Sequence, residues 1–197
     1  MRRYNYDYSS SASYLVGIIF IVFLLQIVLP GFTKEFMLVP TNLKPWQLIS
    51  SIFLHGGFMH LFLNLYALYF FGQYLEYQIG TKKFLFLFFS CGLAGNLLYL
   101  FTIYLNIIPP IPALGASGAI YGILGALAVL NPNLQILLFG FIPLRMKEAA
   151  ILWFVMEFVG SFDVSSGIGS AAHLGGLVLG YLIAKTDLFK LQMENMW

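Results

Sequence analysis

The chain has 197 residues, of which 60% are hydrophobic and 9% are charged, and its formal net charge is +2. Soluble globular domains contain about 45–50% apolar and about 25% charged residues, so this composition excludes an ordinary soluble domain and indicates a polytopic membrane protein. The small, dispersed positive charge gives no basis for nucleic-acid binding, and the single cysteine, Cys91, excludes an intrachain disulfide.

Six apolar stretches predict six membrane-spanning helices. We expect them at residues 14–29, 53–77, 84–105, 116–130, 149–159 and 170–184. The fourth helix has about 15 residues, fewer than the ~20 that cross a full bilayer, so it should begin below the membrane surface. The predicted fold is therefore all-α, with one membrane domain over 14–186, a short cytoplasmic tail at 1–13 and a second tail at 187–197.

The segments between these helices differ in character. Residues 30–54 mix prolines and charged residues with large apolar ones such as Trp46, which is typical of a long loop in the membrane interface. Residues 133–144 predict a loop on the cytoplasmic side that touches the membrane. We interpret Glu157, near the end of the fifth helix, as an interfacial carboxylate in preference to a catalytic one.

The distribution of basic residues predicts the orientation in the membrane. With six spans, eight of the ten Lys and Arg residues fall on the side of the N-terminus: Arg2, Arg3, Lys82, Lys83, Arg145, Lys147, Lys185 and Lys190. Lys34 and Lys44 fall on the other side, so both termini are expected in the cytoplasm. The N-terminal stretch lacks the character of a transit peptide, which favours a cell membrane.

Ser117 is the candidate nucleophile, because it opens the fourth helix after a proline-rich loop. A serine hydroxyl needs a base to take its proton, and His173, near the start of the sixth helix, is the natural one. Tyr121 follows Ser117 by four residues and is expected to pack against that imidazole. With no carboxylate expected near His173, the predicted site is a Ser–His dyad.

Donors for an oxyanion are also expected at the same depth, because the second, fourth and sixth helices all begin on the outer side. His60 and Asn64 are four residues apart on the second helix and project from one face. With the backbone N–H of Ser117 they supply three donors, and loss of one such donor typically lowers turnover by about 10²–10³. Glycines along the fourth and sixth helices should let these two helices approach closely.

Each feature also has a simpler structural interpretation. Gly-Ala-Ser-Gly in a membrane helix is typical of helix packing, and Ala119 stands where the nucleophile elbow of soluble hydrolases has glycine. His60 with Asn64 is equally consistent with hydrogen bonding between helices, and His55 with a scaffold role. The three histidines form no helical His-Glu-x-x-His pattern, so we expect no metal site.

Together these motifs resemble the rhomboid family of intramembrane serine proteases. The resemblance rests on His55-Gly-Gly-Phe-Met-His60-Leu-Phe-Leu-Asn64, Gly115-Ala116-Ser117-Gly118, Ala172-His173-Leu-Gly-Gly176-Leu-Val-Leu-Gly180 and Glu76-x₃-Gly80. It covers nearly the whole chain, in order and with the family's spacing. One position departs from the family pattern, since Gln47 follows Trp46 where the family usually has arginine.

The resemblance implies a six-helix rhomboid-like bundle that cuts single-span membrane proteins near the outer membrane surface. Ser117 would be the nucleophile and His173 its base, while His60, Asn64 and the Ser117 amide would hold the oxyanion. Tyr121 would stack on the histidine, with His55 and Gly115 in supporting positions. No cofactor would be needed, and the partners would be transmembrane substrates and the lipid bilayer. The fifth helix would border the substrate entrance.

Two other functions compete with an active protease. A catalytically dead rhomboid-like binding protein would recognise membrane helices without cutting them, but such proteins lack the serine or the histidine, and this chain has both. A small transporter would use the same polar residues as a pathway and should have an internal repeat with broken helices. We find no such repeat, and the polar residues gather on one side of the membrane.

Overall fold

The structure is a computed structural model that describes residues 10–138, 141–162, 167–186 and 189, and it is mainly helical. The longer helices are α1 (Ser11–Val28), α4 (Phe58–Ala67), α5 (Gln73–Ile79), α6 (Thr81–Tyr104), α7 (Ser117–Leu130), α8 (Met146–Gly160) and α9 (Gly167–Ala184). A π-helical turn, η3 (Leu68–Gly72), joins α4 to α5 without a break. The short elements are α2 (Phe32–Phe36), η1 (Pro40–Asn42), α3 (Gln47–Ser50), η2 (Ser51–Phe53), β1 (Gln135–Leu138) and β2 (Ile142–Arg145).

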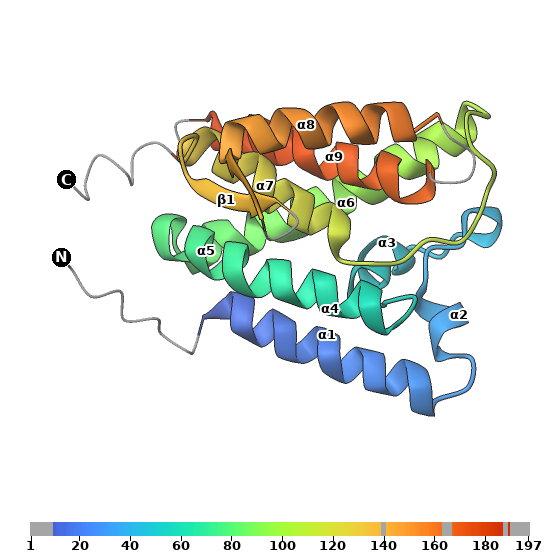
Figure 1. The fold of residues 1–197 in the computed structure, drawn as a ribbon. Helices are drawn as coiled ribbons and strands as arrows, with labels where there is room; N and C mark the ends of the chain where they lie inside the picture. The colour runs from blue at the N-terminus through green and yellow to red at the C-terminus, as the bar shows by residue number, and fades with distance from the viewer. Residues whose placement is uncertain (1–9, 139–140, 163–166, 187–188, 190–197) are drawn as a thin grey trace.

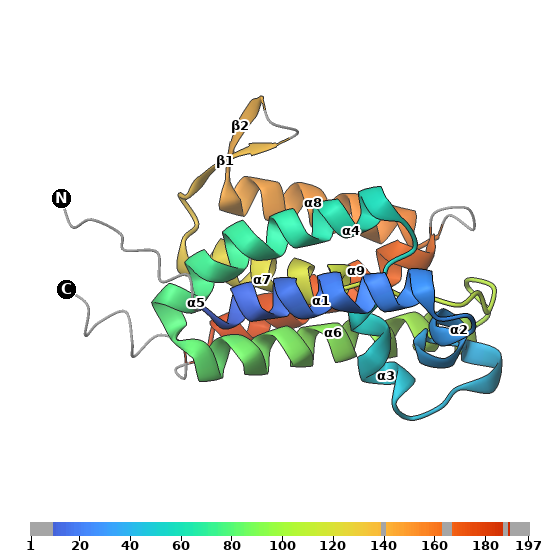
Figure 2. The same cartoon turned by 90° about the horizontal axis from the view of Figure 1, so that it is seen from below.

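The long helices lie side by side in one bundle and alternate in direction (Figures 1 and 2). As a result α4, α7 and α9 all begin at the end of the bundle where α2 and α3 lie, and the β-hairpin projects at the opposite end. The core residues of the main cluster come mostly from α1, α4, η3, α5, α6 and α7, with Ile52 of η2, Met146 of α8 and Ala184 of α9. Polar residues near the starts of α4, α7 and α9 therefore lie at one end of the bundle.

Among the described residues, two helices, α1 and α6, are long and apolar enough to cross a membrane by length and composition. The α3–η2 segment is followed by the α4–η3–α5 helix, and the two apolar segments meet at an angle of 92°. They add a third candidate span if both are counted together as one broken span. The apolar helix α7 is shorter, and so is the apolar stretch Gly169–Ala184 of α9. At 1.5 Å per residue, a helix of the length of α7 is about 21 Å long, less than the ~30 Å of a bilayer core.

Two segments expected to be loops contain regular structure. Within 30–54 the chain forms α2, η1, α3 and η2. The prediction of a loop over 133–144 is wrong, because β1 and β2 pair antiparallel in that segment, with Gln135 opposite Arg145 and Ile136 opposite Leu144. The apolar side chains that favoured a membrane contact belong to a two-stranded hairpin.

Local chemistry accounts for where the helices begin and end. The second predicted helix begins at Phe58 and not near Phe53, because Gly56 and Gly57 separate it from the short η2 turn. It ends at Gly80, whose positive φ of 79° suits glycine at the end of a helix. At α8, the side chain of Glu148 accepts a hydrogen bond from the backbone N–H of Arg145 (3.0 Å) and caps the helix at Met146.

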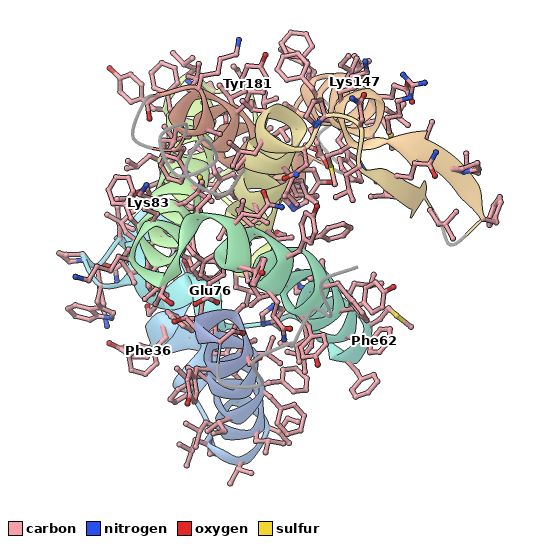
Figure 3. All side chains as sticks on the ribbon, turned by 90° about the vertical axis from the view of Figure 1, so that its left-hand side faces the viewer. Phe36, Phe62, Glu76, Lys83, Lys147 and Tyr181 are labelled. Carbon is pink, nitrogen blue, oxygen red and sulfur yellow. The ribbon has the colours of Figure 1, made fainter. Side chains whose placement is uncertain are left out.

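Glu76 joins three helices through one buried carboxylate (Figure 3). It lies on α5 and accepts hydrogen bonds from the backbone N–H groups of Ser11 (3.0 Å) and Ala12 (2.9 Å), in the first turn of α1. It also accepts one from the Thr81 hydroxyl (2.8 Å), at the start of α6. The carboxylate satisfies N–H groups that have no acceptor within their own helix, and the helix dipole favours negative charge there.

We therefore expect Glu76→Gln to lower the free energy of unfolding by about 1.5–3 kcal/mol, the usual worth of hydrogen bonds to a charged group. The amide N–H group of glutamine would face the backbone N–H groups of α1, and two donors cannot form a hydrogen bond with each other. Thermal unfolding in detergent measures this loss. The matched control is Glu35→Gln, because Glu35 pairs with Lys44 (2.6 Å) with 46% of its side chain exposed, and exposed pairs contribute little. Equal midpoints for the two variants would contradict the role of Glu76.

Candidate active site

The loop that leads into α7 is held on both sides by backbone and side-chain hydrogen bonds. Leu38 and Ala113 exchange two backbone hydrogen bonds of 2.9 Å, and the N–H of Gly115 donates to the carbonyl oxygen of Ser51 (2.9 Å). From α6, the hydroxyl of Tyr99 donates to the carbonyl oxygen of Ile111. These contacts fix the position at which α7 begins, and therefore the position of Ser117.

The helices α7 and α9 touch through their backbones. A Cβ atom added to Gly176 of α9 would lie 1.8 Å from the carbonyl oxygen of Gly118, and one added to Gly180 would lie 2.0 Å from that of Gly122. Side chains larger than hydrogen therefore do not fit at these points. Ser117 precedes Gly118, and His173 lies one turn before Gly176, so this close approach brings the two polar side chains together.

Ser117 and His173 are in direct hydrogen-bonding contact. The Nε2 atom of His173 lies 2.7 Å from the Oγ atom of Ser117. The ring of Tyr121, one turn after Ser117, stacks on the imidazole with 4.3 Å between ring centroids and an interplanar angle of 5°. The structure therefore brings together the nucleophile and base predicted from the sequence, with the aromatic ring against the base.

His60 and Asn64 approach the same place from α4. A Cβ atom on Gly115 would lie 3.0 Å from Nε2 of His60 and 3.6 Å from Oγ of Ser117, so the His60 ring and the serine face one another across a glycine. Gly115 has a φ of +134°, a conformation that L side chains rarely adopt. The amide of Asn64 is buried and donates to the carbonyl oxygen of His60 (2.8 Å), which leaves its second N–H for another acceptor.

His55 supports this arrangement from the segment before α4. It is buried, and its ring lies 5.0 Å from that of His60. Its backbone exchanges two hydrogen bonds with the side-chain amide of Gln26 on α1, at 2.9 and 3.1 Å. His55 thereby connects α1 to the ring of His60. Among the described residues, no group of three or more His, Cys, Asp or Glu side chains is placed to hold a metal ion.

Glu157 is the residue that sequence reasoning placed wrongly. We expected no carboxylate near His173, yet Oε1 of Glu157 lies 3.0 Å from Nδ1 of His173 and accepts a hydrogen bond from the Tyr121 hydroxyl (2.6 Å). The side chains of His173 and Glu157 are 20% and 13% exposed. A signal was available in the sequence, because an acidic residue inside an apolar helix is costly and marks a partner or a function.

Gln47, a neutral residue, hydrogen-bonds to the loop between α1 and α4. It is buried, its side-chain carbonyl accepts from the N–H groups of Val39 and Lys44 at 3.2 Å each, and its amide donates to the carbonyl oxygen of Glu35 (3.1 Å). All three bonds reach into residues 35–44. A neutral amide thus occupies the position where the family pattern has arginine, and it cross-links the loop on which Leu38 lies.

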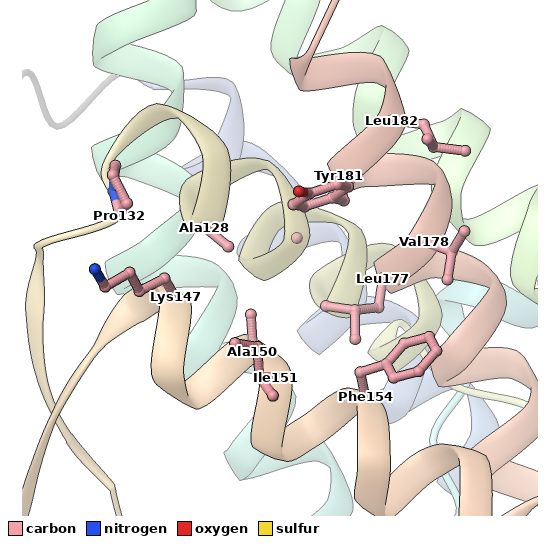
Figure 4. Close-up of a pocket in the computed structure, with 11 residues that line it drawn as sticks. Ala128, Pro132, Lys147, Ala150, Ile151, Phe154, Leu177, Val178, Tyr181 and Leu182 are labelled. Atoms are coloured by element: carbon pink, nitrogen blue, oxygen red, sulfur yellow. The ribbon is translucent and has the colours of Figure 1, made fainter.

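A cavity of about 550 Å³ lies between α7, α8 and α9 (Figure 4). Its walls include Ala128 and Pro132 near the end of α7, Lys147 and Ile151 on α8, and Tyr181 on α9. Gly125, Phe154 and Leu177 also line it, about one helical turn from Tyr121, Glu157 and His173. The side chains of Ser117, His173, Tyr121 and Glu157 are not among the lining residues.

Comparisons with known proteins identify relatives over most of the chain. The model of the rhomboid domain family matches residues 42–189. The chain is 33% identical over 167 residues to "Rhomboid protein 1, mitochondrial" of Saccharomyces cerevisiae, and the alignment covers 77% of the chain and 45% of that protein. It is 32% identical over 140 residues to "Rhomboid protease GluP" of Bacillus subtilis, covering 71% of the chain and 25% of the relative.

A third relative differs in its stated activity. The chain is 30% identical over 158 residues to "Inactive RHOMBOID-like protein 8" of Arabidopsis thaliana, covering 79% of the chain and 42% of that protein. The chain thus spans less than half the length of each of these three relatives. A relative named as a protease and a relative named as inactive match this chain at 32% and 30% identity. The catalytic activity of this chain therefore has to be argued from the residues of the site.

Proposed function

The chain belongs to the rhomboid family of membrane proteins, and from this premise we propose that it is an intramembrane serine endopeptidase with Ser117 as nucleophile and His173 as base. The observation that carries the proposal is the 2.7 Å contact between Nε2 of His173 and Oγ of Ser117. That distance lies within the range over which a base takes a proton from a nucleophile.

The proposed reaction is acyl transfer. The Ser117 oxygen attacks the carbonyl carbon of the scissile peptide bond while Nε2 of His173 takes the hydroxyl proton. Collapse of the tetrahedral intermediate breaks the C–N bond, and the imidazolium returns that proton to the leaving amine. Water, activated by the same histidine, then releases the acyl group from Ser117. This chemistry requires no cofactor.

The negative charge on the tetrahedral intermediate needs donors that are already in place. We propose that the ring N–H of His60, the free N–H of Asn64 and the backbone N–H of Ser117 supply them. The His60 ring and the Ser117 hydroxyl both lie beside Gly115, where an added Cβ atom would be 3.0 Å from Nε2 of His60 and 3.6 Å from Oγ of Ser117, and this supports the role. The N–H of Ser117 is in the first turn of α7, where backbone donors have no acceptor within the helix.

We propose that six helical segments cross the bilayer: α1, α4–η3–α5, α6, α7, α8 and α9. Their alternating directions (Figure 1) and the eight-to-two distribution of Lys and Arg residues support a membrane domain over 14–186 with both termini in the cytoplasm of a cell membrane. The substrates are then single-span membrane proteins, cut near the outer surface. The first loop, with α2 and α3, lies at the same end as Ser117 and is placed at that interface.

A non-cleaving protein that binds membrane helices is the second candidate, since one relative carries the name inactive. The contact between Ser117 and His173 favours cleavage, because a binding protein has no need of a base in hydrogen-bonding contact with a serine. The two functions make opposite predictions for the reactivity of this serine.

The test is cleavage of a fluorescent single-span membrane protein by purified protein in liposomes. We expect the wild type to cut within or beside the transmembrane segment, as located by mass spectrometry, and to react at Ser117 with a fluorophosphonate. Ser117→Ala should do neither. Cleavage that persists in Ser117→Ala would contradict the mechanism, and a wild type that neither cuts any of several substrates nor reacts with the probe would favour the binding protein.

A further inference from the structure

The acidic residue of α8 completes a chain of polar contacts that begins at Ser117. Nε2 of His173 faces Oγ of Ser117 at 2.7 Å, and the other ring nitrogen, Nδ1, faces Oε1 of Glu157 at 3.0 Å. The two contacts use opposite sides of one imidazole. Three helices supply the three groups: α7 supplies the serine, α9 the histidine and α8 the carboxylate.

An ionised carboxylate only accepts hydrogen bonds, so a contact with Nδ1 requires the proton on that nitrogen. Nε2 of His173 is then unprotonated and can accept the proton of Ser117. When the imidazole takes that proton and becomes positively charged, the negative charge next to Nδ1 stabilises it. These are the two roles of the third residue in a serine protease triad, and both act through the histidine.

We propose that Glu157 is a positioning residue that holds His173 in the tautomer and orientation that activate Ser117, so that the site is a Ser117–His173–Glu157 triad. The inference rests on the proposed protease function and extends it by one residue. It replaces the dyad that the sequence predicted, in which Tyr121 alone orients the base.

Tyr121 has a second contact that supports this arrangement. Its ring stacks on the imidazole at 4.3 Å, and its hydroxyl donates to the same Oε1 atom of Glu157 at 2.6 Å. Oε1 of Glu157 therefore receives one hydrogen bond from Tyr121 and one from His173. Placing an ion in a largely buried site is costly unless it is paired and hydrogen-bonded. Tyr121, His173 and the side chain of Ser170 all hydrogen-bond to Glu157, so its carboxylate is not left without partners.

Within the part of the chain that the structure describes, Glu157 does not cap the start of a helix, in contrast to Glu148 and Glu76. Glu148, the other acidic residue of α8, caps the first turn of the helix and is half exposed, with 47% of its side chain accessible. Glu76 caps the starts of α1 and α6. Glu157 instead lies near the end of α8, where a helix dipole disfavours negative charge. Its position is therefore explained by its partners and not by its helix.

The experiment compares Glu157→Gln with the matched charge removal Glu148→Gln on the same helix, alongside wild type and Ser117→Ala, in the liposome cleavage assay. Gln keeps the size of the side chain but presents an amide that can donate to Nδ1 and favour the wrong tautomer. We expect kcat of Glu157→Gln to fall by about 10²–10⁴ with KM nearly unchanged, and Glu148→Gln to match wild type.

A second readout separates positioning from a loss of packing. The side chains that contact His173 among the described residues are Ser117, Glu157 and Tyr121. Glu157→Asp keeps a carboxylate on a shorter side chain, so it should recover part of the kcat that Glu157→Gln loses. A purely structural role of the side chain would leave the two folded variants equally slow.

A third measurement needs no variant. Nitrogen NMR of histidine-labelled wild type in detergent should find the neutral His173 protonated at Nδ1, and this result stands even if Glu157→Gln fails to fold. Protonation at Nε2, or a kcat for folded Glu157→Gln equal to that of Glu148→Gln, would overturn the triad. If Ser117→Ala still cuts, the proposed protease function itself fails. If Ser117→Ala is inactive while Glu157→Gln is fully active, only the triad fails.

Discussion

His173→Ala is expected to slow substrate cleavage by about 10⁴–10⁶, as much as Ser117→Ala, and the double variant is expected to be no slower than either single variant. The reason is the direct contact between the two side chains: without the imidazole the serine keeps its proton, and without the serine the base has no group to activate. Rates of the four proteins on one fluorescent substrate in liposomes measure this.

The residual rate of these three variants would report what the proposed oxyanion donors on α4, His60 and Asn64, contribute on their own, because all three variants keep them. Ser90→Ala, on α6 and outside the site, is the control and should cut at the wild-type rate. Losses that multiply in the double variant would mean that Ser117 and His173 act independently, which would contradict the proposed mechanism.

Gly176→Ala is expected to abolish more than 99% of the activity, a loss of about 10²-fold or more, and to lower the thermal midpoint. The added methyl group would lie 1.8 Å from the carbonyl oxygen of Gly118, which is backbone and has no rotamer to change. The strain is relieved when α7 and α9 move apart. Ser117 and His173 lie on those two helices beside the clash, so their contact should lengthen as well.

Gly17→Ala on α1 is the matched control, since no atom of a neighbouring element among the described residues lies within 4 Å of the added Cβ. The same chemical change there should leave cleavage unaltered and stability equal or slightly higher, because alanine favours a helix over glycine. Cleavage rate and thermal unfolding in detergent are measured on both variants. If Gly176→Ala matched Gly17→Ala in both measurements, close contact between the backbones of α7 and α9 would not be required for cleavage or for stability.

The sequence predicted the helices well where composition alone decides them. The apolar stretches appear as α1, α4–η3–α5, α6, α7, α8 and α9, with ends that shift by a few residues. The hairpin of β1 and β2 was missed because its apolar residues also fit a membrane contact. The start of α4 was missed because the apolar run continues through Phe53 across the glycines that interrupt the helix.

Within the site, the prediction was best for residues whose partners follow from helix spacing. Tyr121 is one turn after Ser117, so its packing on the same side was foreseeable. The partners of Glu157 were not foreseeable, although an acidic residue in an apolar helix indicates that a partner exists. Which residues lie next to Glu157 depends on how α8 is rotated against α7 and α9. The apolar residues of α8 are spread around the helix and do not form one distinct apolar face. The sequence pattern therefore does not indicate which side of α8 packs against α7 and α9.

The placement of Glu157 bears on how this protein would lose activity on heating. The only buried residues of α8 are Met146 and Ala149, both in its first turn, while side chains farther along, such as Ile151, Val155 and Val159, are more than half exposed to the surroundings. The far half of this helix therefore has no buried apolar side chain to hold it against α7 and α9, and weakly packed elements open before the whole structure does. Fraying there would withdraw the carboxylate from His173 while α7 and α9 stay packed. Inactivation would then precede unfolding, and it would reverse on cooling.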